Sequence, residues 1–317
     1  MRHYRGIGEL PMGVTDRAVA IGAFDGVHLG HREIIRVAVE AARRGNMPSM
    51  VITFDPNPLE VLRPEFKTTV LTSADVRARI IAALGVDELL EIPFTKAFSH
   101  IRWDRFCEIL AMPPIGAQTI AVGRNFRFGH GGEGTAGMLR DAGRQRGIDV
   151  VVPALVTSPD GKPISSTRVR RLIAQGEIAD ANTLLGRAHC LKGVVVHGDG
   201  RGAGLGIPTA NLEVSSRAAI PGRGVYAGRA TVDGATWPAA INVGMAPTVR
   251  DAHDIRVEAL LIDYPGGDLY DLPASVAFLE HLRGETRFVS TDALVAQITK
   301  DVARARDIAT GAPDPLC

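Results

Sequence analysis

The chain has 317 residues, of which 45% are hydrophobic and 22% are charged. This length and composition exclude a disordered or collagen-like chain and predict two globular domains of about 150 residues each. The 36 Lys and Arg side chains balance 35 Asp and Glu side chains. The resulting net charge of +1 gives no electrostatic reason to expect a nucleic-acid-binding or membrane-surface protein.

The first half of the chain alternates short apolar runs with helical patterns. The predicted strands are residues 17–24, 50–54, 89–94, 119–123 and 149–155, and the predicted helices are residues 31–44, 73–84, 103–111 and 135–146. Strict alternation predicts a parallel sheet covered by helices on both faces. In such sheets, ligands bind at the carboxyl ends of the strands.

After residue 181 the pattern changes to strand-like runs separated by glycine-rich turns. These runs are residues 191–197, 225–232, 236–243, 256–263 and 275–282, and an amphipathic helix follows from residue 291 to about residue 306. They predict an antiparallel barrel or sandwich closed by the helix. We therefore expect domains at residues 1–185 and 186–317, with a frayed tail at residues 311–317.

The three cysteines, Cys107, Cys190 and Cys317, are widely spaced and form no CxxC pair. This spacing favours neither a disulfide framework nor a zinc site, so we expect reduced thiols. The apolar runs are only strand length, and the first residues lack the apolar core of a signal peptide. We therefore expect a cytoplasmic protein.

A strand, a glycine-rich turn and a helix start follow one another at residues 20–34, which read AIGAFDGVHLGHREI. This arrangement aims backbone N–H groups and the positive end of the helix at an anion. His28 and His31 are spaced so that both imidazoles can donate hydrogen bonds to phosphate oxygens in one cavity. Two alternatives stay open: ordinary surface or capping histidines, and a metal pair, for which a third ligand of suitable spacing is missing.

A second candidate phosphate segment lies at residues 163–172, which read PISSTRVRRL. Hydroxyl groups precede a cluster of arginines at a helix start, a combination that suits a polyphosphate, although SST alone is a common helix cap. None of the five lysines follows a GxxxxG run, so a Walker-type loop is excluded. The GxGxxG match at residues 129–134 does not open directly from a strand and is weak.

Together these two motifs resemble the HxGH and ISSTxxR signatures of the nucleotidyltransferase superfamily. GAFDGVHLGH in particular resembles the adenylyltransferase half of bacterial bifunctional riboflavin kinase/FAD synthetases, and residues 53–62 (TFDPNPLEVL) and 122–135 (VGRNFRFGHGGEGT) also fit. The resemblance implies a Rossmann-like α/β nucleotidyltransferase domain that adenylylates FMN with ATP to give FAD and diphosphate.

The same resemblance implies site residues in this domain. ATP and its phosphates would be bound by Gly22, Phe24, Asp25, His28, Gly30, His31, Ser165, Ser166, Thr167 and Arg170, of which His28, His31 and Arg170 would be catalytic. Asn125 and Phe126 would lie near the flavin nucleotide or the ATP. Asn57 stands where many members have His, so no imidazole role is transferred to it.

In the second half, residues 195–212 read VVHGDGRGAGLGIPTANL, a loop whose backbone is free to wrap phosphates. Alone, it is equally consistent with a glycine-rich hairpin. PTAN after a glycine loop resembles the riboflavin kinase signature, and GVYAG at 224–228, INVGMAPTV at 241–249, RVEALLID at 256–263 and FLEHLRGETRF at 278–288 follow in family order. The resemblance therefore implies a riboflavin kinase-like barrel that converts riboflavin and ATP to FMN and ADP.

From this resemblance, Gly204 and Gly206 would bind ATP, and Thr209 and Asn211 would hold its phosphates and Mg²⁺. Glu258 would be the general base for the ribityl 5′-hydroxyl, and Arg283 would contact flavin or phosphate. A solvent-facing glutamate and a surface arginine are the alternatives. Ala246 and Asp271 stand where the family has Asn and Gly, which leaves the shape of the flavin pocket open.

The resemblance spans residues 21–306 and implies a bifunctional enzyme that uses ATP, riboflavin, FMN, FAD and Mg²⁺. We expect small-molecule nucleotides and flavins as partners, but neither nucleic acid nor membrane, and the sequence leaves the oligomeric state open. Two other functions remain. The first domain could use another acceptor, such as a pantetheine or choline phosphate, or the barrel could be a non-enzymatic flavin sensor or oligonucleotide-binding module.

Overall fold

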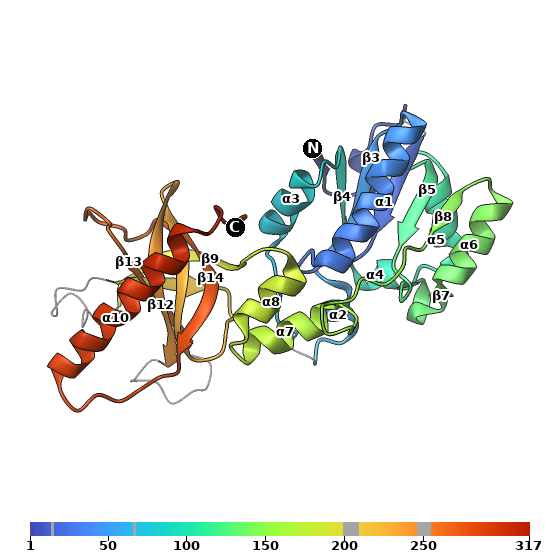
Figure 1. Cartoon of the computed structure of the whole chain (residues 1–317). Coiled ribbons are helices and arrows are strands. Elements are labelled where there is room, and N and C mark those ends of the chain that lie inside the picture. The colour runs from blue at the N-terminus through green and yellow to red at the C-terminus, as the bar shows by residue number, and fades with distance from the viewer. Residues whose placement is uncertain (14–15, 66–67, 199–208, 246–254) are drawn as a thin grey trace. The chain divides into compact units, whose positions relative to one another are not determined.

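The computed structural model describes residues 1–13, 16–65, 68–198, 209–245 and 255–317 (Figure 1). Two predicted phosphate-binding residues, Gly204 and Gly206, and the family departure Ala246 lie outside the described residues. The chain forms two units, one of Met1–Thr68 and Ala74–Ser165 and the other of Thr69–Ser73 and Ser166–Cys317. This division assigns residues 166–185 to the second unit, whereas the functional boundary at residue 185 stays a prediction.

The first unit contains a six-stranded sheet in which every strand pair is parallel. Its strand order is β1-β4-β3-β2-β5-β8, with β1 Arg2–Tyr4, β2 Arg17–Ile21, β3 Ser49–Asp55, β4 Glu88–Pro93, β5 Ala117–Val122 and β8 Asp149–Val151. The predicted parallel sheet is thus confirmed. The sequence did not predict β1, and the strand predicted at residues 149–155 ends at Val151.

Helices connect these strands in the predicted alternation. They are α1 Leu29–Gly45, α2 Pro58–Leu62, α3 Ala74–Ala83, α4 Lys96–Ser99, α5 Trp103–Ala111 and α6 Ala136–Gln145, and a small hairpin of β6 Arg127–Phe128 and β7 Gly134–Thr135 precedes α6. The Thr135 hydroxyl accepts a hydrogen bond from Met138 N at 3.2 Å, so Thr135 caps α6.

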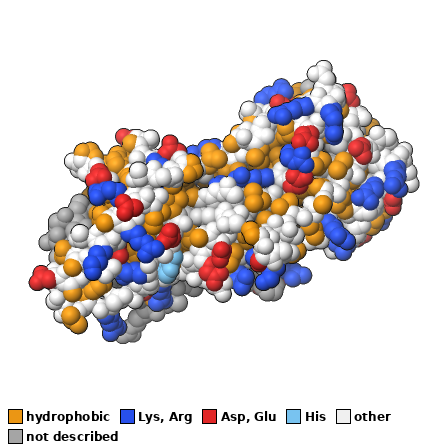
Figure 2. All heavy atoms as spheres, in the orientation of Figure 1, with side chains coloured by type: hydrophobic (Ala, Val, Ile, Leu, Met, Phe, Trp, Pro, Cys, Tyr) orange, Lys and Arg blue, Asp and Glu red, His pale blue; other side chains and the backbone are white. Residues whose placement is uncertain are grey.

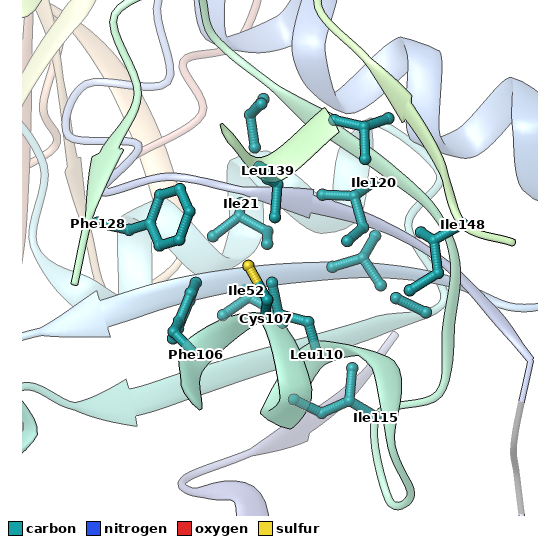
Figure 3. Packing of buried hydrophobic residues seen from close by; sticks show 14 of the residues in the cluster. Ile21, Ile52, Phe106, Cys107, Leu110, Ile115, Ile120, Phe128, Leu139 and Ile148 are labelled. Carbon is teal, nitrogen blue, oxygen red and sulfur yellow. The ribbon is translucent and has the colours of Figure 1, made fainter. Parts of the chain in front are cut away.

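Both faces of this sheet are buried, because alternate residues of its strands enter different apolar clusters. Val19 and Ile21 of β2 pack with α5 and α6, whereas Ala20 packs with α1 and α3. Figure 3 shows the first cluster, with the sulfur of Cys107 among its side chains. Burial raises the pKa of the Cys107 thiol to about 11, so this thiol stays protonated at neutral pH.

The second unit contains a closed six-stranded barrel, which confirms the predicted barrel. Its strand order is β10-β13-β12-β11-β14-β9, with β9 His189–Val196, β10 Ala210–Val214, β11 Gly224–Val232, β12 Ala235–Met245, β13 Ile255–Leu261 and β14 Pro273–Arg283. All of its strand pairs are antiparallel. The sequence did not predict β10, which directly follows the glycine-rich segment.

The last helix, α10 Thr291–Thr310, lies along the outside of the barrel strands (Figure 1). Ala305 of α10 is fully buried against Ala227, Ala240 and Ile262 of the barrel. The predicted helix is therefore confirmed, and it continues four residues beyond the expected end at 306. The Ser290 hydroxyl caps it by accepting a hydrogen bond from Ala293 N at 3.2 Å.

Two further helices of this unit, α7 Ser166–Ala174 and α8 Ile178–Leu185, precede the barrel. The side chain of Asn182 in α8 forms hydrogen bonds with both β14 and β9. Its amide N–H donates to Phe278 O at 2.8 Å, and its oxygen accepts from His189 N at 2.7 Å. The His189 ring lies 2.7 Å from Ala219 O and is buried. Burial lowers the pKa of His189 to about 4, so the imidazole is neutral at neutral pH.

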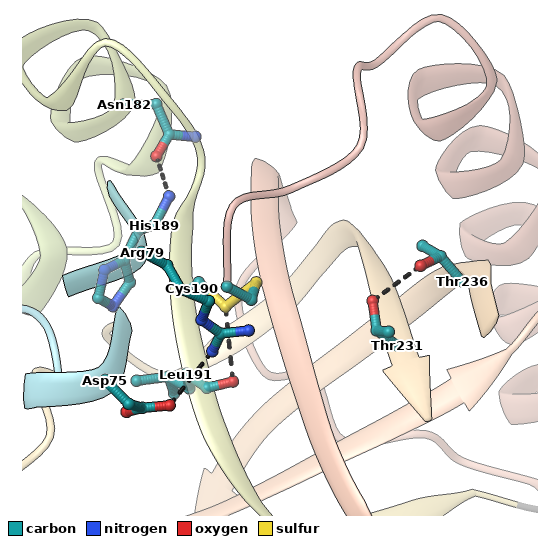
Figure 4. Close-up of a disulfide and its surroundings, with 9 residues drawn as sticks. Asp75, Arg79, Asn182, His189, Cys190, Leu191, Thr231 and Thr236 are labelled. Carbon is teal, nitrogen blue, oxygen red and sulfur yellow. Dashed lines mark hydrogen bonds and ion pairs between the residues drawn. A yellow bond between two sulfur atoms is a disulfide. The ribbon is translucent and has the colours of Figure 1, made fainter. Parts of the chain in front are cut away.

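The C-terminal tail is anchored rather than frayed, and two of the cysteines are oxidised. Cys317 forms a disulfide with Cys190 of β9 (Figure 4), while Cys107 alone is a free thiol. Arg229 of β11 also donates to Ala312 O at 2.7 Å and pairs with Asp314 at 2.8 Å. The expectations of three reduced thiols and a frayed tail were therefore wrong. The disulfide joins two residues that are 127 positions apart in the sequence.

The surface carries both signs of charge. On the face that Figure 2 shows, Lys and Arg side chains are interspersed with Asp and Glu side chains rather than gathered in one patch. Among the described residues, no helix has the length and apolar character needed to cross a membrane.

Candidate functional site

The first candidate site lies at β2, where the order of strands in the sheet of the first unit reverses. From β2 the chain proceeds to β3 and β4 on one side, and later returns to place β5 and β8 on the other side. Ile21 of β2 and Val122 of β5 are register partners, so the loops that carry His28 and Asn125 leave adjacent strand ends. The carboxyl ends of two such neighbouring strands are where open α/β sheets bind ligands.

The turn after β2 has an unusual backbone. Phe24 has φ 48° and Val27 has φ 38°, although both side chains are buried and neither residue is glycine. The Phe24 ring packs so closely on Gly22 that a Cβ there would lie 3.0 Å from two ring carbons. Left-handed backbone at bulky residues is destabilising by about 1–3 kcal/mol each and concentrates at functional sites.

His28 is both the cap of α1 and part of a histidine pair. Its Nδ1 accepts a hydrogen bond from His31 N at 3.2 Å, and the two rings stack with centroids 3.6 Å apart. Because Nδ1 is an acceptor, the proton of the neutral imidazole resides on Nε2. The capping interpretation is thus correct for Nδ1, and Nε2 carries the donor that the phosphate interpretation requires.

Gly30, between the two histidines, is closely packed. A Cβ on Gly30 would lie 3.2 Å from Cε1 and 3.3 Å from Nδ1 of His28, and 3.8 Å from Ile164 O. The segment that leads into Ser165 therefore runs beside the first turn of α1. Ser165 belongs to the same unit as the histidines.

The remaining residues of the ISSTxxR motif belong to the second unit. Ser166 and Thr167 form the first turn of α7. Arg170, one turn later, donates from Nε to Thr69 O at 2.6 Å, which fixes its guanidinium against the backbone. Their predicted contact with ATP phosphates stays a prediction.

Asn125 and Phe126 lie in the turn after β5, where Phe126 N donates to Gly123 O at 3.0 Å. Asn125 is exposed, and the Phe126 ring stacks on Phe128 with centroids 5.4 Å apart. Asn57, the departure from the family pattern, caps α2 by accepting a hydrogen bond from Leu59 N at 3.1 Å. An asparagine cap explains its presence locally, without a catalytic role.

Two arginines that were not predicted as site residues line a cavity of about 400 Å³ beside this turn. They are Arg124 and Arg140, and the cavity also borders the first turn of α6 and residues 152–155, which follow β8. Their positive charge lies at the carboxyl ends of β5 and β8. The sequence offered one signal for Arg124, its position directly before Asn125.

The second candidate site is built by strand register in the barrel. Glu258 of β13 is directly opposite Asn211 of β10 on one side and Asn242 of β12 on the other. Directly paired residues share one face of a sheet, so these three polar side chains form a row. The alternate residues Ile241 and Val257 are buried inside the barrel, so the row faces outward, on the side that α10 covers.

This row borders a cavity of about 440 Å³ between the barrel surface and the chain that leads into α10. Its lining is Thr209, Val225, Ala240, Asn242, Glu258, Leu260, Arg283, Glu285, Thr286, Phe288, Leu294, Ile298 and Asp301. Three predicted site residues, Thr209, Glu258 and Arg283, are thus brought together. Glu258 is half-buried here, which disfavours the alternative of a solvent-facing strand glutamate.

Asn211 lies against the entry to the glycine-rich segment. A Cβ on Gly198 would lie 2.1 Å from Asn211 Nδ2, so only glycine permits this approach. Asn211 Oδ1 is buried and accepts no hydrogen bond from any residue that the structure describes. A buried carbonyl oxygen of this kind is suited to a hard cation.

Three further residues of this site, Asn242, Glu285 and Asp301, were not predicted from the sequence. Asn242 follows the apolar residues 237–241 of β12 and lies in the family segment INVGMAPTV, and these are the sequence signals that mark it. Glu285 Oε1 would lie 2.8 Å from a Cβ on Gly244, and Asn242 Nδ2 would lie 3.4 Å from it, so both side chains approach the same point of β12. Asp301 pairs with Arg283 at 2.8 Å.

Comparison with known proteins assigns a family to each half of the chain. The family model described as FAD synthetase matches residues 12–168, and the model described as riboflavin kinase matches residues 185–309. The chain is 36% identical over 309 residues to the bifunctional riboflavin kinase/FMN adenylyltransferases of Pseudomonas fluorescens and Escherichia coli K12. These alignments cover 98% and 97%, respectively, of both partners.

The fold of the whole chain also has a solved relative. The crystal structure of a protein described as a macrolide-efflux protein from Streptococcus pneumoniae superposes with a TM-score of 0.85 at 30% identity. It covers 96% of this chain and 98% of that one. From its sequence, its two matched models and its near full-length relatives, this chain belongs to the bifunctional riboflavin kinase/FMN adenylyltransferase family.

Proposed function

We propose that residues 186–317 phosphorylate riboflavin with ATP, giving FMN and ADP, and that residues 1–185 adenylylate FMN with ATP, giving FAD and diphosphate. The observation that carries the proposal is the row of Glu258 between Asn211 and Asn242 at the edge of a cavity. A carboxylate in this setting can accept a proton from a bound hydroxyl. The aliphatic and aromatic side chains of the cavity suit the ring system of a flavin.

In the kinase reaction, Glu258 takes the proton of the ribityl 5′-hydroxyl as its oxygen attacks the γ-phosphorus of ATP, and ADP leaves. Thr209 and Asn211 supply hard oxygen donors, and the buried Oδ1 of Asn211 fits a Mg²⁺ ligand. When bound, Mg²⁺ neutralises charge that develops on the transferred phosphoryl group. Gly198 permits the close packing that holds the Asn211 side chain in place.

In the adenylyltransferase reaction, an FMN phosphate oxygen attacks the α-phosphorus of ATP, and diphosphate leaves. The nucleophile is already anionic, so positioning and charge stabilisation matter more than a base. His28 donates from Nε2, and His31 and the start of α1 add donors at the same place. Ser165, Ser166, Thr167 and Arg170 bind the β and γ phosphates, and Asn125 and Phe126 bind the flavin nucleotide.

Product analysis tests the proposal. Purified full-length chain with ATP, Mg²⁺ and riboflavin should yield FMN and then FAD, separated by chromatography with fluorescence detection. Glu258→Gln should abolish FMN formation but leave FAD formation from supplied FMN intact. Glu213→Gln, an exposed glutamate on the neighbouring strand β10, is the matched control and should leave both reactions unchanged. FMN formation by Glu258→Gln at the rate of that control would refute the assignment of the base.

A further inference from the structure

The guanidinium of Arg283 is held by three neighbours at the edge of the barrel cavity. Nε and Nη2 contact Asp301 Oδ2 at 2.9 and 2.8 Å, and Nη1 donates to Gly284 O at 3.1 Å. The group also lies 5.6 Å from the centroid of the Phe288 ring. An arginine restrained in this way is a fixed part of the wall rather than a mobile cation.

Asp301 is itself restrained. It is 7% exposed in the middle of α10, and its second oxygen, Oδ1, accepts a hydrogen bond from Gln297 Nε2 at 2.9 Å. The next residue, Val302, and Ala305, one turn further along, pack on the barrel and fix the helix there. Both carboxylate oxygens are thus committed, and a buried carboxylate that lost its cation would be strongly destabilised.

Arg283 and Asp301 line the part of the cavity whose other side chains are mainly apolar. Arg283 is the register partner of Val225, which in turn pairs with Asn242, so the arginine continues the polar row that contains Glu258. The other lining residues nearest to the α10 side are Leu260, Phe288, Leu294 and Ile298. These side chains suit an aromatic heterocycle and offer nothing to a triphosphate. Thr209, a lining residue next to the glycine-rich segment, suits phosphate.

We propose that Asp301 is a positioning residue for riboflavin phosphorylation. Its carboxylate fixes the orientation of the Arg283 guanidinium against the flavin and compensates its charge. It thereby prevents the arginine from turning toward the phosphates of ATP. The pair thereby sets the affinity for the flavin substrate while contributing little to the transfer step. This inference rests on the proposed assignment of the cavity to the kinase reaction.

The test compares Asp301→Asn with Asp307→Asn, the same change at an exposed position of the same helix. Loss of a charged hydrogen-bond partner should raise the riboflavin KM of Asp301→Asn by about tenfold, with the ATP KM and kcat changed less than about twofold. Riboflavin binding without ATP, followed by flavin fluorescence, should weaken by the same factor. Asp301→Glu should restore part of the affinity, and FAD formation from supplied FMN should be unchanged.

Arg283→Lys supplies a second variant that keeps a cation beside Asp301, so the proposal remains testable if Asp301→Asn does not fold. It should raise the riboflavin KM similarly, and the double variant should be no worse than the poorer single variant. A riboflavin KM for Asp301→Asn equal to that of Asp307→Asn would overturn the proposal, as would an increase confined to the ATP KM. If Glu258→Gln abolishes FMN formation while Asp301→Asn has no effect, only the positioning role fails.

Discussion

Replacing His28 by Asn and by Ala separates the two roles that the structure gives this residue. Asparagine is a good helix cap, so His28→Asn should keep α1 capped and lose only the imidazole, whereas His28→Ala loses both. Because Nδ1 of His28 accepts the hydrogen bond from His31 N, we expect the free energy of unfolding of His28→Ala to be about 1 kcal/mol lower than that of His28→Asn. Because both variants lose the Nε2 donor, we expect kcat for FAD formation to fall about 100- to 1000-fold in each.

Stability is measured by denaturant unfolding in a Trp237→Phe background, which leaves Trp103 in the first unit as the single tryptophan. Activity is measured as FAD formed from supplied FMN, with riboflavin phosphorylation in the same preparations as an internal control. His100→Asn, at an exposed histidine of the same unit, should behave as the unmodified chain. Wild-type FAD formation by His28→Asn would show that His28 is only a cap and would refute the phosphate assignment.

Three other predictions concern the second unit. His189 titrates near pH 6.5 when unfolded but has a pKa of about 4 when folded, so the unfolded state binds more protons between these values and stability falls as the pH drops. The loss should reach about 2 kcal/mol at pH 5 and be absent in His189→Gln, as measured by unfolding at a series of pH values. Cys317→Ser should lower the free energy of unfolding by at most about 5 kcal/mol in oxidising buffer and by nothing in reducing buffer, because the cross-link closes a 127-residue loop. Gly198→Ala should displace the Asn211 side chain and raise the ATP KM of the kinase by about tenfold or more, with FAD formation from FMN unaffected; an unchanged ATP KM would separate Asn211 from ATP binding.

The first site was predictable from the sequence because its parts are contiguous in the chain. The end of β2, the turn and the start of α1 occupy residues 17–31, so a glycine-rich run between an apolar run and a helical pattern already indicates an anion site. The left-handed backbone of Phe24 and Val27 was not predictable, since neither residue favours it. Such backbone strain persists only where the packing around the turn stabilises it by more than the strain costs.

The second site was only partly predictable because strand register assembles it. Glu258 was identified through its motif, but its neighbour Asn242 follows from the pairing of β12 with β13, which local patterns do not specify. β10 was missed because it has only five residues and directly follows glycine-rich sequence. The disulfide likewise joins residues that are distant in the sequence, and Arg229 contacts the same tail at Ala312 and Asp314, which local patterns do not specify.

The scarcity of lysine, with five in the chain, is consistent with how these sites hold their charged groups. Arg283 uses three N–H groups on a carboxylate and a carbonyl, and Arg170 uses one on Thr69 O. A planar guanidinium can keep such contacts and still present a remaining edge to a ligand, whereas an ammonium group on a flexible stem cannot. Reactions that depend on positioning rather than on a strong base gain from cations that are oriented before the substrate arrives. The same reasoning predicts that lysine is a poor substitute at either arginine, even though the charge is unchanged.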